Sequence, residues 1–166
     1  MPSADDLHGQ IQLACQYFHS RVGLPLLRYE TAEMLTHDQT WEPWNDLPIR
    51  LHIGPGAPVC VVWMYTYRLL IECDAPVPHW NTWTEPDQFR WAANALPLLE
   101  PLRGGTLRSA HLGRDTNLAP NDLAFNEWNR LLVEFDRGWL EVFNALDQNG
   151  YAVHAARPDG EWVRCA

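Results

Sequence analysis

The stretch NDLAFNEWNRLLVEFDRGWLEVFNALD, residues 121–147, carries the longest amphipathic pattern in the chain and decides the predicted fold. Its large apolar residues recur at intervals of three and four, the periodicity of one face of an α-helix. Gly138 lowers helix propensity by about 1 kcal/mol relative to alanine, and Asn149-Gly150 ends the pattern. We therefore predict a long C-terminal amphipathic helix, with its apolar face formed by Phe125, Trp128, Leu132, Phe135, Trp139, Val142 and Leu146.

Two more helices are predicted upstream. Residues 5–22 place apolar side chains on one stripe, with Ser3 as the N-cap and Gly23 followed by Pro25 at the C-terminal end. Residues 86–99 form a middle helix that has Pro86 in its first turn and is ended or kinked by Pro97.

Strands are predicted between and after these helices. Residues 49–53 alternate apolar and polar side chains, and residues 59–73 form one long bent strand or two strands joined at a bulge. Short strands are expected at residues 26–30 and 104–112. Residues 151–156 and 161–165 flank Pro158-Asp159-Gly160, which predicts a hairpin.

The predicted fold class is therefore α+β. It has one antiparallel sheet, an N-terminal helix, a middle helix and a long C-terminal amphipathic helix, and it ends in a short hairpin. A chain of 166 residues with 46% hydrophobic content is most simply one domain, residues 1–166.

The charge is strongly negative, with a formal net charge of −9, and all twelve basic residues are arginine. The acidic excess lies in residues 1–46 and 122–148. Phosphate contacts need clusters of Lys and Arg, so this balance disfavours nucleic acid as a partner. It favours a basic or polar protein, mainly through faster encounter, although net charge also serves solubility alone.

The four cysteines, Cys15, Cys60, Cys73 and Cys165, show no CxxC spacing. The start MPSADD lacks the features of a signal peptide, and the longest apolar run is too short to span a bilayer. We therefore expect a cytoplasmic protein with reduced thiols and no membrane insertion.

No motif indicates catalysis, a metal or a cofactor. His52, Cys60, Cys73, His79 and His111 have no metal-ligand spacing relative to one another. Ser109, His111 and Asp115 are neighbours in sequence rather than a triad, and nucleotide-binding loops are absent. We expect no enzymatic activity and no cofactor.

The nine tryptophans divide into two groups. Trp63, Trp91, Trp128 and Trp139 are predicted to pack in the core, and Trp162 lies in the predicted hairpin. Trp41, Trp44, Trp80 and Trp83 lie in two loops, where they either cover the ends of the sheet or form a binding patch.

The element order and acidity resemble the class I type III secretion chaperones. The similarity rests on the opening helix that ends at GLPLL, the sheet from Leu47 to Cys73, the LPLLEPL helix and the acidic helix from Asn121. It implies a homodimer that holds an extended bacterial effector segment. It also implies partner contacts at Leu27, Tyr29, Ile49, Leu51, Val62 and Met64, beside the four loop tryptophans.

The main alternative is an immunity protein that binds and neutralises a cognate bacterial toxin. It shares the small size and the acidity, but it caps a folded active site, whereas a chaperone binds an unfolded segment. A third class, an enzyme that binds a sugar or another small molecule, requires the four loop tryptophans to line one deep pocket.

Overall fold

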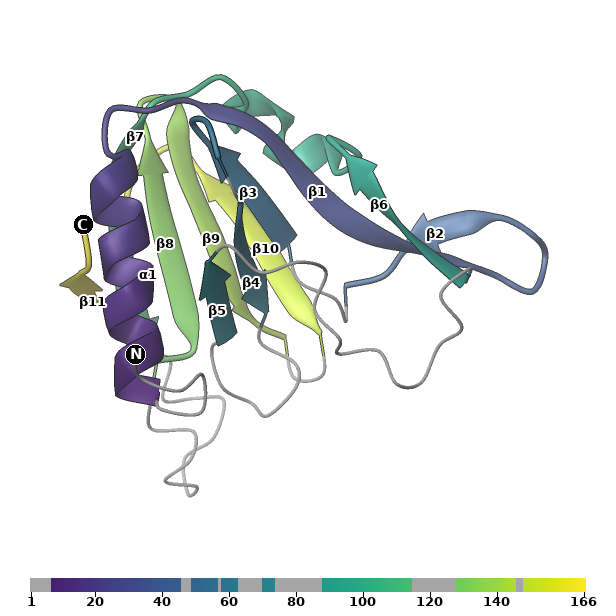
Figure 1. The fold of residues 1–166 in the computed structure, drawn as a ribbon, viewed down its shortest axis with the longest axis horizontal. Helices are drawn as coiled ribbons and strands as arrows, with labels where there is room; N and C mark the ends of the chain where they lie inside the picture. The colour runs from purple at the N-terminus through teal and green to yellow at the C-terminus, as the bar shows by residue number, and fades with distance from the viewer. Residues whose placement is uncertain are drawn as a thin grey trace.

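A computed structural model describes residues 7–45, 49–56, 58–62, 70–73, 88–114, 128–145 and 148–166. The described chain is mainly β, with two antiparallel sheets and one α-helix (Figure 1). The predicted α+β class, with a middle helix and a long C-terminal helix, is therefore wrong.

The N-terminal helix is confirmed as α1, Leu7–Arg21. Gly23 follows with a φ of 88°, a left-handed conformation that glycine adopts without steric cost. Ala14, Tyr17 and Phe18 are buried on the inward face of α1, as the apolar stripe of the sequence requires.

The first sheet follows the order β2-β1-β3-β4-β5, with β6 paired to β1. The predicted alternation in β3 is confirmed, because Ile49, Leu51 and Ile53 are buried while the residues between them are half-buried. The predicted strand 59–73 is two strands that pair antiparallel, with Val62 opposite Leu70. The strands are β1 Leu26–Leu35, β2 Trp41–Pro43, β3 Ile49–Ile53, β4 Val59–Val62, β5 Leu70–Cys73 and β6 Phe89–Ala93.

The second sheet follows the order β10-β9-β8-β7-β11. Its strands are β7 Leu107–Arg114, β8 Arg130–Phe135, β9 Gly138–Asn144, β10 Asn149–His154 and β11 Glu161–Arg164. The short strand predicted at residues 104–112 is therefore confirmed as part of β7.

The predicted helix 121–147 is wrong over its described part, which forms the antiparallel strands β8 and β9. Leu131, Leu132 and Val133 are buried in succession, so both faces of β8 are covered. An apolar run buried on both faces contains intervals of three and four without being a helix. The turn signal is Gly138, whose φ of 141° is unfavourable for other residues.

The predicted middle helix is also wrong. Residues 89–93 form β6, which pairs with β1, and Pro97–Leu102 form the short 3₁₀-helix η3. Pro101 inside η3 disfavours a regular α-helix, because it lacks an N–H and its ring clashes with the preceding turn, but Leu99 and Leu102 still reach the core.

The predicted terminal hairpin is wrong, because β10 and β11 lie at opposite edges of the second sheet. β10 pairs with β9, and β11 pairs with β7. Residues 155–160 therefore connect the two edges instead of forming a tight turn.

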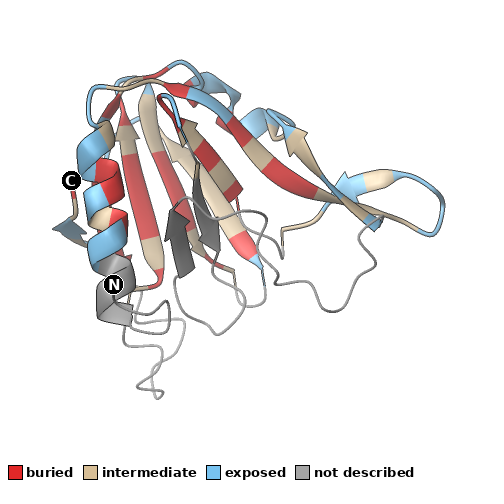
Figure 2. Cartoon of the chain, in the orientation of Figure 1, coloured by how far each residue is buried: buried red, intermediate tan, exposed pale blue. Residues whose placement is uncertain are grey.

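The core lies between the two sheets and under α1 (Figure 2). The sheets are joined where Leu26 N–H donates to Gly105 O at 2.8 Å and Leu107 N–H donates to Leu24 O at 2.9 Å. The largest fully buried side chains come from both sheets, α1 and η3: Phe18, Leu26, Tyr29, Ile49, Leu51, Ile53, Leu99, Leu102, Leu107, Leu131 and Phe135.

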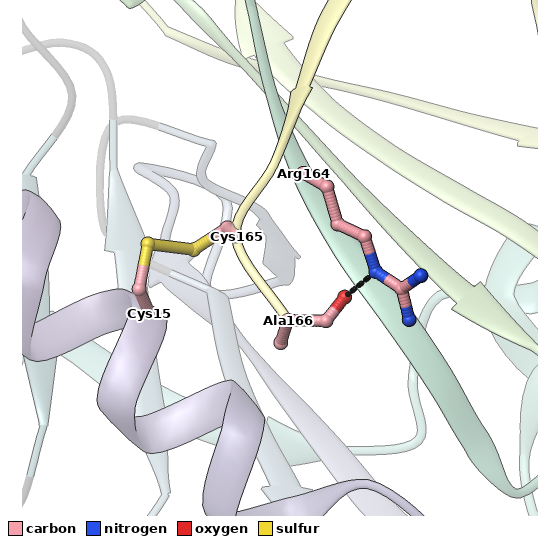
Figure 3. The surroundings of a disulfide bond; sticks show 4 residues. All are labelled: Cys15, Arg164, Cys165 and Ala166. Atoms are coloured by element: carbon pink, nitrogen blue, oxygen red, sulfur yellow. Dashed lines mark hydrogen bonds between the residues drawn. A yellow bond between two sulfur atoms is a disulfide. The ribbon is translucent and has the colours of Figure 1, made fainter.

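A disulfide joins Cys15 of α1 to Cys165, one residue after β11 (Figure 3). The expectation of reduced thiols is therefore wrong for this pair. Ala166 also ties the end of the chain to β7. Its N–H donates to the Ala110 carbonyl, and its carbonyl accepts a hydrogen bond from the Ala110 N–H. No helix among the described residues is long and apolar enough to cross a membrane.

We expect loss of this disulfide to destabilise the fold substantially, because the two cysteines are 150 residues apart in sequence. A crosslink that closes so long a loop contributes about 3 to 5 kcal/mol to the free energy of unfolding, which urea titration measures. The Cys15→Ser/Cys165→Ser variant should show this loss and should not respond to dithiothreitol.

The Cys60→Ser/Cys73→Ser variant is the matched control and should keep the response to dithiothreitol. An unchanged urea midpoint of the native protein after full reduction would contradict the prediction.

Candidate functional site

The second half of β1 leaves the body of the molecule together with β2 and β6 (Figure 1). Residues 31–35 of β1, β2 with the turn before it, and β6 are called the arm below. The core cluster includes Leu26 and Tyr29 from the first half of β1, but no described residue of the arm. Core packing therefore does not explain the aromatic side chains of the arm.

The register of β1 decides which side chains share a face of the arm. Glu33 and Met34 each pair with a residue of β2 and with a residue of β6, so β2 and β6 lie on opposite edges of β1. Ala32 pairs with Trp91 of β6, and its carbonyl accepts the Trp44 N–H at 2.9 Å. Since residues directly opposite share a face, Trp44, Ala32 and Trp91 form one row across the arm.

The opposite face of the arm holds Trp41 in a fixed orientation. The guanidinium carbon of Arg90 lies 4.4 Å from the centre of the Trp41 ring. Arg90 Nε donates to Glu33 Oε2 at 2.7 Å. Glu33 thus orients Arg90, and Arg90 stacks on Trp41, so one set of contacts crosses all three strands.

At the base of the arm, Glu30 is surrounded by cationic groups. His52 Nε2 lies 2.9 Å from Glu30 Oε2, and Arg50 and Arg28 lie at 3.6 and 3.5 Å from its carboxylate. Burial acts to raise the pKa of Glu30, but the His52 hydrogen bond and the nearby charges outweigh it, so the pKa is lowered.

Arg50 also joins this base to the row of tryptophans. Its guanidinium carbon lies 3.7 Å from the centre of the Trp91 ring. The base is tied to the second sheet as well, because Asn149 N–H donates to Asn45 O at 2.9 Å. The arm is therefore held at its base and projects from there.

The tip of the arm is polar and exposed. The side chains of His37 and Asp38 are 101% and 85% exposed. The turn is closed by the Thr36 N–H bond to Thr40 O at 2.8 Å, and Gln39 takes a φ of 60°. Asp38 and Glu42 are exposed carboxylates without a cationic partner other than His37 among the described residues.

The predicted site residues separate into three groups. Trp41 and Trp44 are half-buried on opposite faces of the arm. Leu27 is 52% exposed at a bulge in β1, whereas Tyr29, Ile49 and Leu51 are 0% exposed in the core and present no surface to a partner. Trp80, Trp83, Met64 and the side chain of Val62 lie outside the described part of the chain, so a meeting of the two tryptophan pairs stays a prediction.

Sequence reasoning missed Trp91 and Arg90, because both were assigned to the middle helix. Trp91 was expected in the core, yet it lies on the arm beside Ala32. Trp139 was also expected in the core, but it faces His111 on the outside of the second sheet, with 5.9 Å between ring centres. Trp128 does pack against the core, as predicted.

Among the described residues, no group of three His, Cys, Asp or Glu side chains could hold a metal ion. The Ser109 hydroxyl donates to Glu134 Oε2, and Asp115 lies outside the described residues.

Comparison of the chain with protein-family models, with curated proteins and with solved structures finds no match.

We expect the cluster around Glu30 to contribute stability that depends on pH. A carboxyl group with a lowered folded-state pKa stabilises the fold above its unfolded pKa of about 4.3, and this contribution is lost as pH falls through the folded pKa. The difference in unfolding free energy between the native protein and Glu30→Gln should therefore shrink as the pH falls below about 4.

The control is Glu42→Gln, which changes an exposed carboxylate of the same arm. Urea unfolding at a series of pH values measures the effect. A Glu30→Gln variant whose stability follows that of the native protein in parallel from neutral pH to pH 3 would contradict the assigned role of His52.

Proposed function

We propose that the protein is a non-catalytic acidic binding protein that recognises a folded, basic protein partner through the arm. The observation that carries the proposal is the arm itself, whose tryptophans are held in place without contributing to the core. These tryptophans are half-buried, and their remaining apolar surface is costly in water. Tryptophan is also enriched at the energetic centres of interfaces.

The rigidity of the arm supports a binding role. Glu33 and Arg90 orient Trp41, and the Arg50 contact orients Trp91. A side chain that is already ordered loses little conformational entropy when a partner binds. Part of the entropic cost of ordering the interface is therefore incurred when the protein folds and not when the partner binds.

The charge supports a basic partner. The net charge is −9, and the arm adds the exposed carboxylates Asp38 and Glu42 near Trp41. Opposite charge speeds encounter between proteins, while a negative surface repels nucleic acid.

An immunity protein that caps a bacterial toxin suits these features better than an effector chaperone does. Of the four stretches on which the chaperone resemblance rests, the acidic stretch from Asn121 forms two strands over its described part, and LPLLEPL forms the short 3₁₀-helix η3 instead of an α-helix. Tyr29, Ile49 and Leu51, which that resemblance offered to an extended effector segment, are buried. The effector-binding function, the homodimer and the cytoplasmic location stay predictions, and a disulfide is more typical of an oxidising compartment.

The test is affinity capture from the source organism with the native protein and with Trp41→Ala, followed by purification of the captured protein and measurement of Kd. We expect a basic partner and a loss of about 2 kcal/mol in Trp41→Ala, or about 30-fold in Kd. We also expect the association rate to fall as salt is added.

Val163→Ala is the matched control, because Val163 is 51% exposed on β11, outside the arm. Equal Kd values for Trp41→Ala and the native protein would remove the arm from the interface. A captured partner that binds only when unfolded would favour the chaperone function instead.

A further inference from the structure

Three polar residues are buried on the outer face of the second sheet, on the side away from the core. Ser109 is 4% exposed, His111 is 6% exposed and Glu141 is 5% exposed. Residues 155–160, called the covering segment below, connect β10 at one edge of this sheet to β11 at the other. Core packing does not explain why polar side chains are buried on the outer face of a sheet, so their hydrogen-bond partners have to be identified.

Both ends of the covering segment are anchored to the sheet. Before it, His154 Nε2 lies 2.8 Å from Glu141 Oε2, and Glu141 also accepts a hydrogen bond from Arg130 at 2.6 Å. After it, Trp162 donates to Pro158 O at 3.1 Å, and the Arg130 guanidinium carbon lies 4.4 Å from the centre of the Trp162 ring. The covering segment is therefore fixed over the sheet.

Gly113 provides the space for this arrangement. A Cβ atom at Gly113 would lie 2.4 Å from the Trp162 ring, so only glycine leaves room for the ring against β7. This contact holds β11, and with it Arg164, against the His111 side of the sheet.

His111 is enclosed on one side only. Its Nδ1 atom is buried and has no hydrogen-bond partner. A buried N–H without an acceptor is rarer in proteins than a buried acceptor without a donor, so the ring proton belongs on Nε2. The Nε2–H group is therefore a donor without an acceptor among the described residues.

Arg164 is directly opposite His111 in the pairing of β11 with β7, so the two side chains share the outer face of the sheet. Arg157 precedes Pro158, whose carbonyl accepts a hydrogen bond from Trp162 on the same edge strand. Burial, then the charge of Arg157, then that of Arg164 lower the pKa of His111, while Glu134 opposes them. The ring is therefore neutral near pH 7, and it faces two positive charges.

Arg157 and Arg164 are among the five described arginines that form no ion pair with a described carboxylate. Arg164 donates to the Ala166 carbonyl at 2.8 Å (Figure 3), but neither Arg164 nor Arg157 forms an ion pair with a carboxylate among the described residues. The arginines that do form such pairs are Arg28, Arg50, Arg90, Arg103, Arg108 and Arg130.

We propose that Arg157, Arg164 and the Nε2–H group of His111 form a binding site for a phosphate dianion, free or carried on a monoester. All three groups are donors, and two positive charges match the charge of the dianion. A metal cation is unsuitable beside two guanidinium groups. The site is on the second sheet and is independent of the arm.

The test uses the full-length oxidised protein and follows the His111 ring by NMR during titration with inorganic phosphate at constant ionic strength. We expect a saturable shift of the His111 signals and a rise in the pKa of His111, because the bound anion offsets the two arginine charges. A parallel titration with a small phosphate monoester distinguishes the sources: tighter binding of the monoester indicates an organic phosphate, and equal binding indicates the free ion.

The Arg157→Gln/Arg164→Gln variant should bind phosphate at least about tenfold more weakly. Arg108→Gln is the matched control, because Arg108 is an exposed arginine of the neighbouring strand β7 that pairs with Asp136 at 3.8 Å. No response of His111 to phosphate, the same response in the double variant, or the same response to acetate would overturn the proposal.

Discussion

The backbone hydrogen bonds between residues 24–26 and 104–107 are the constraint on which the rest of the structure depends. Through them the beginning of β1 is joined to the beginning of β7, so the two sheets share one junction. Leu26 and Leu107, both fully buried at this junction, connect the apolar faces of the two sheets. Because buried backbone groups must be paired, this junction fixes how the sheets face each other. The disulfide then fastens α1 and the end of β11 on the same side.

The arm follows from the length of β1. Strand β1 has ten residues, whereas its neighbour β3 has five and pairs only with the first half of β1. The second half carries β2 and β6 away from the core, and short-range contacts such as Arg90 with Glu33 order it instead. Side chains ordered outside a core are available to a partner, which is why we place recognition there.

In the second sheet, strand β8 carries buried apolar residues on both of its faces. Leu132 is 0% exposed, although the core lies against its neighbours Leu131 and Val133. Leu132 therefore lies on a part of the outer face that is closed to solvent. His111, on the same outer face, has a buried Nδ1 atom without a hydrogen-bond partner and lies directly opposite Arg164 of β11.

Local patterns in the sequence determined α1 with its glycine end, the alternation of β3, the strand of β7 and the acidic charge, since each depends on neighbours within a few residues. Of the predicted site, this reasoning placed Trp41 and Trp44 outside the core but misplaced Trp91. Only the tertiary structure decided that residues 130–144 are two strands, because burial on both faces hides the two-residue period that identifies a strand. It also decided that β6 pairs with β1, that β10 and β11 are separated, and that Cys15 meets Cys165. Each of these contacts joins residues far apart in the chain, and no local periodicity carries that information.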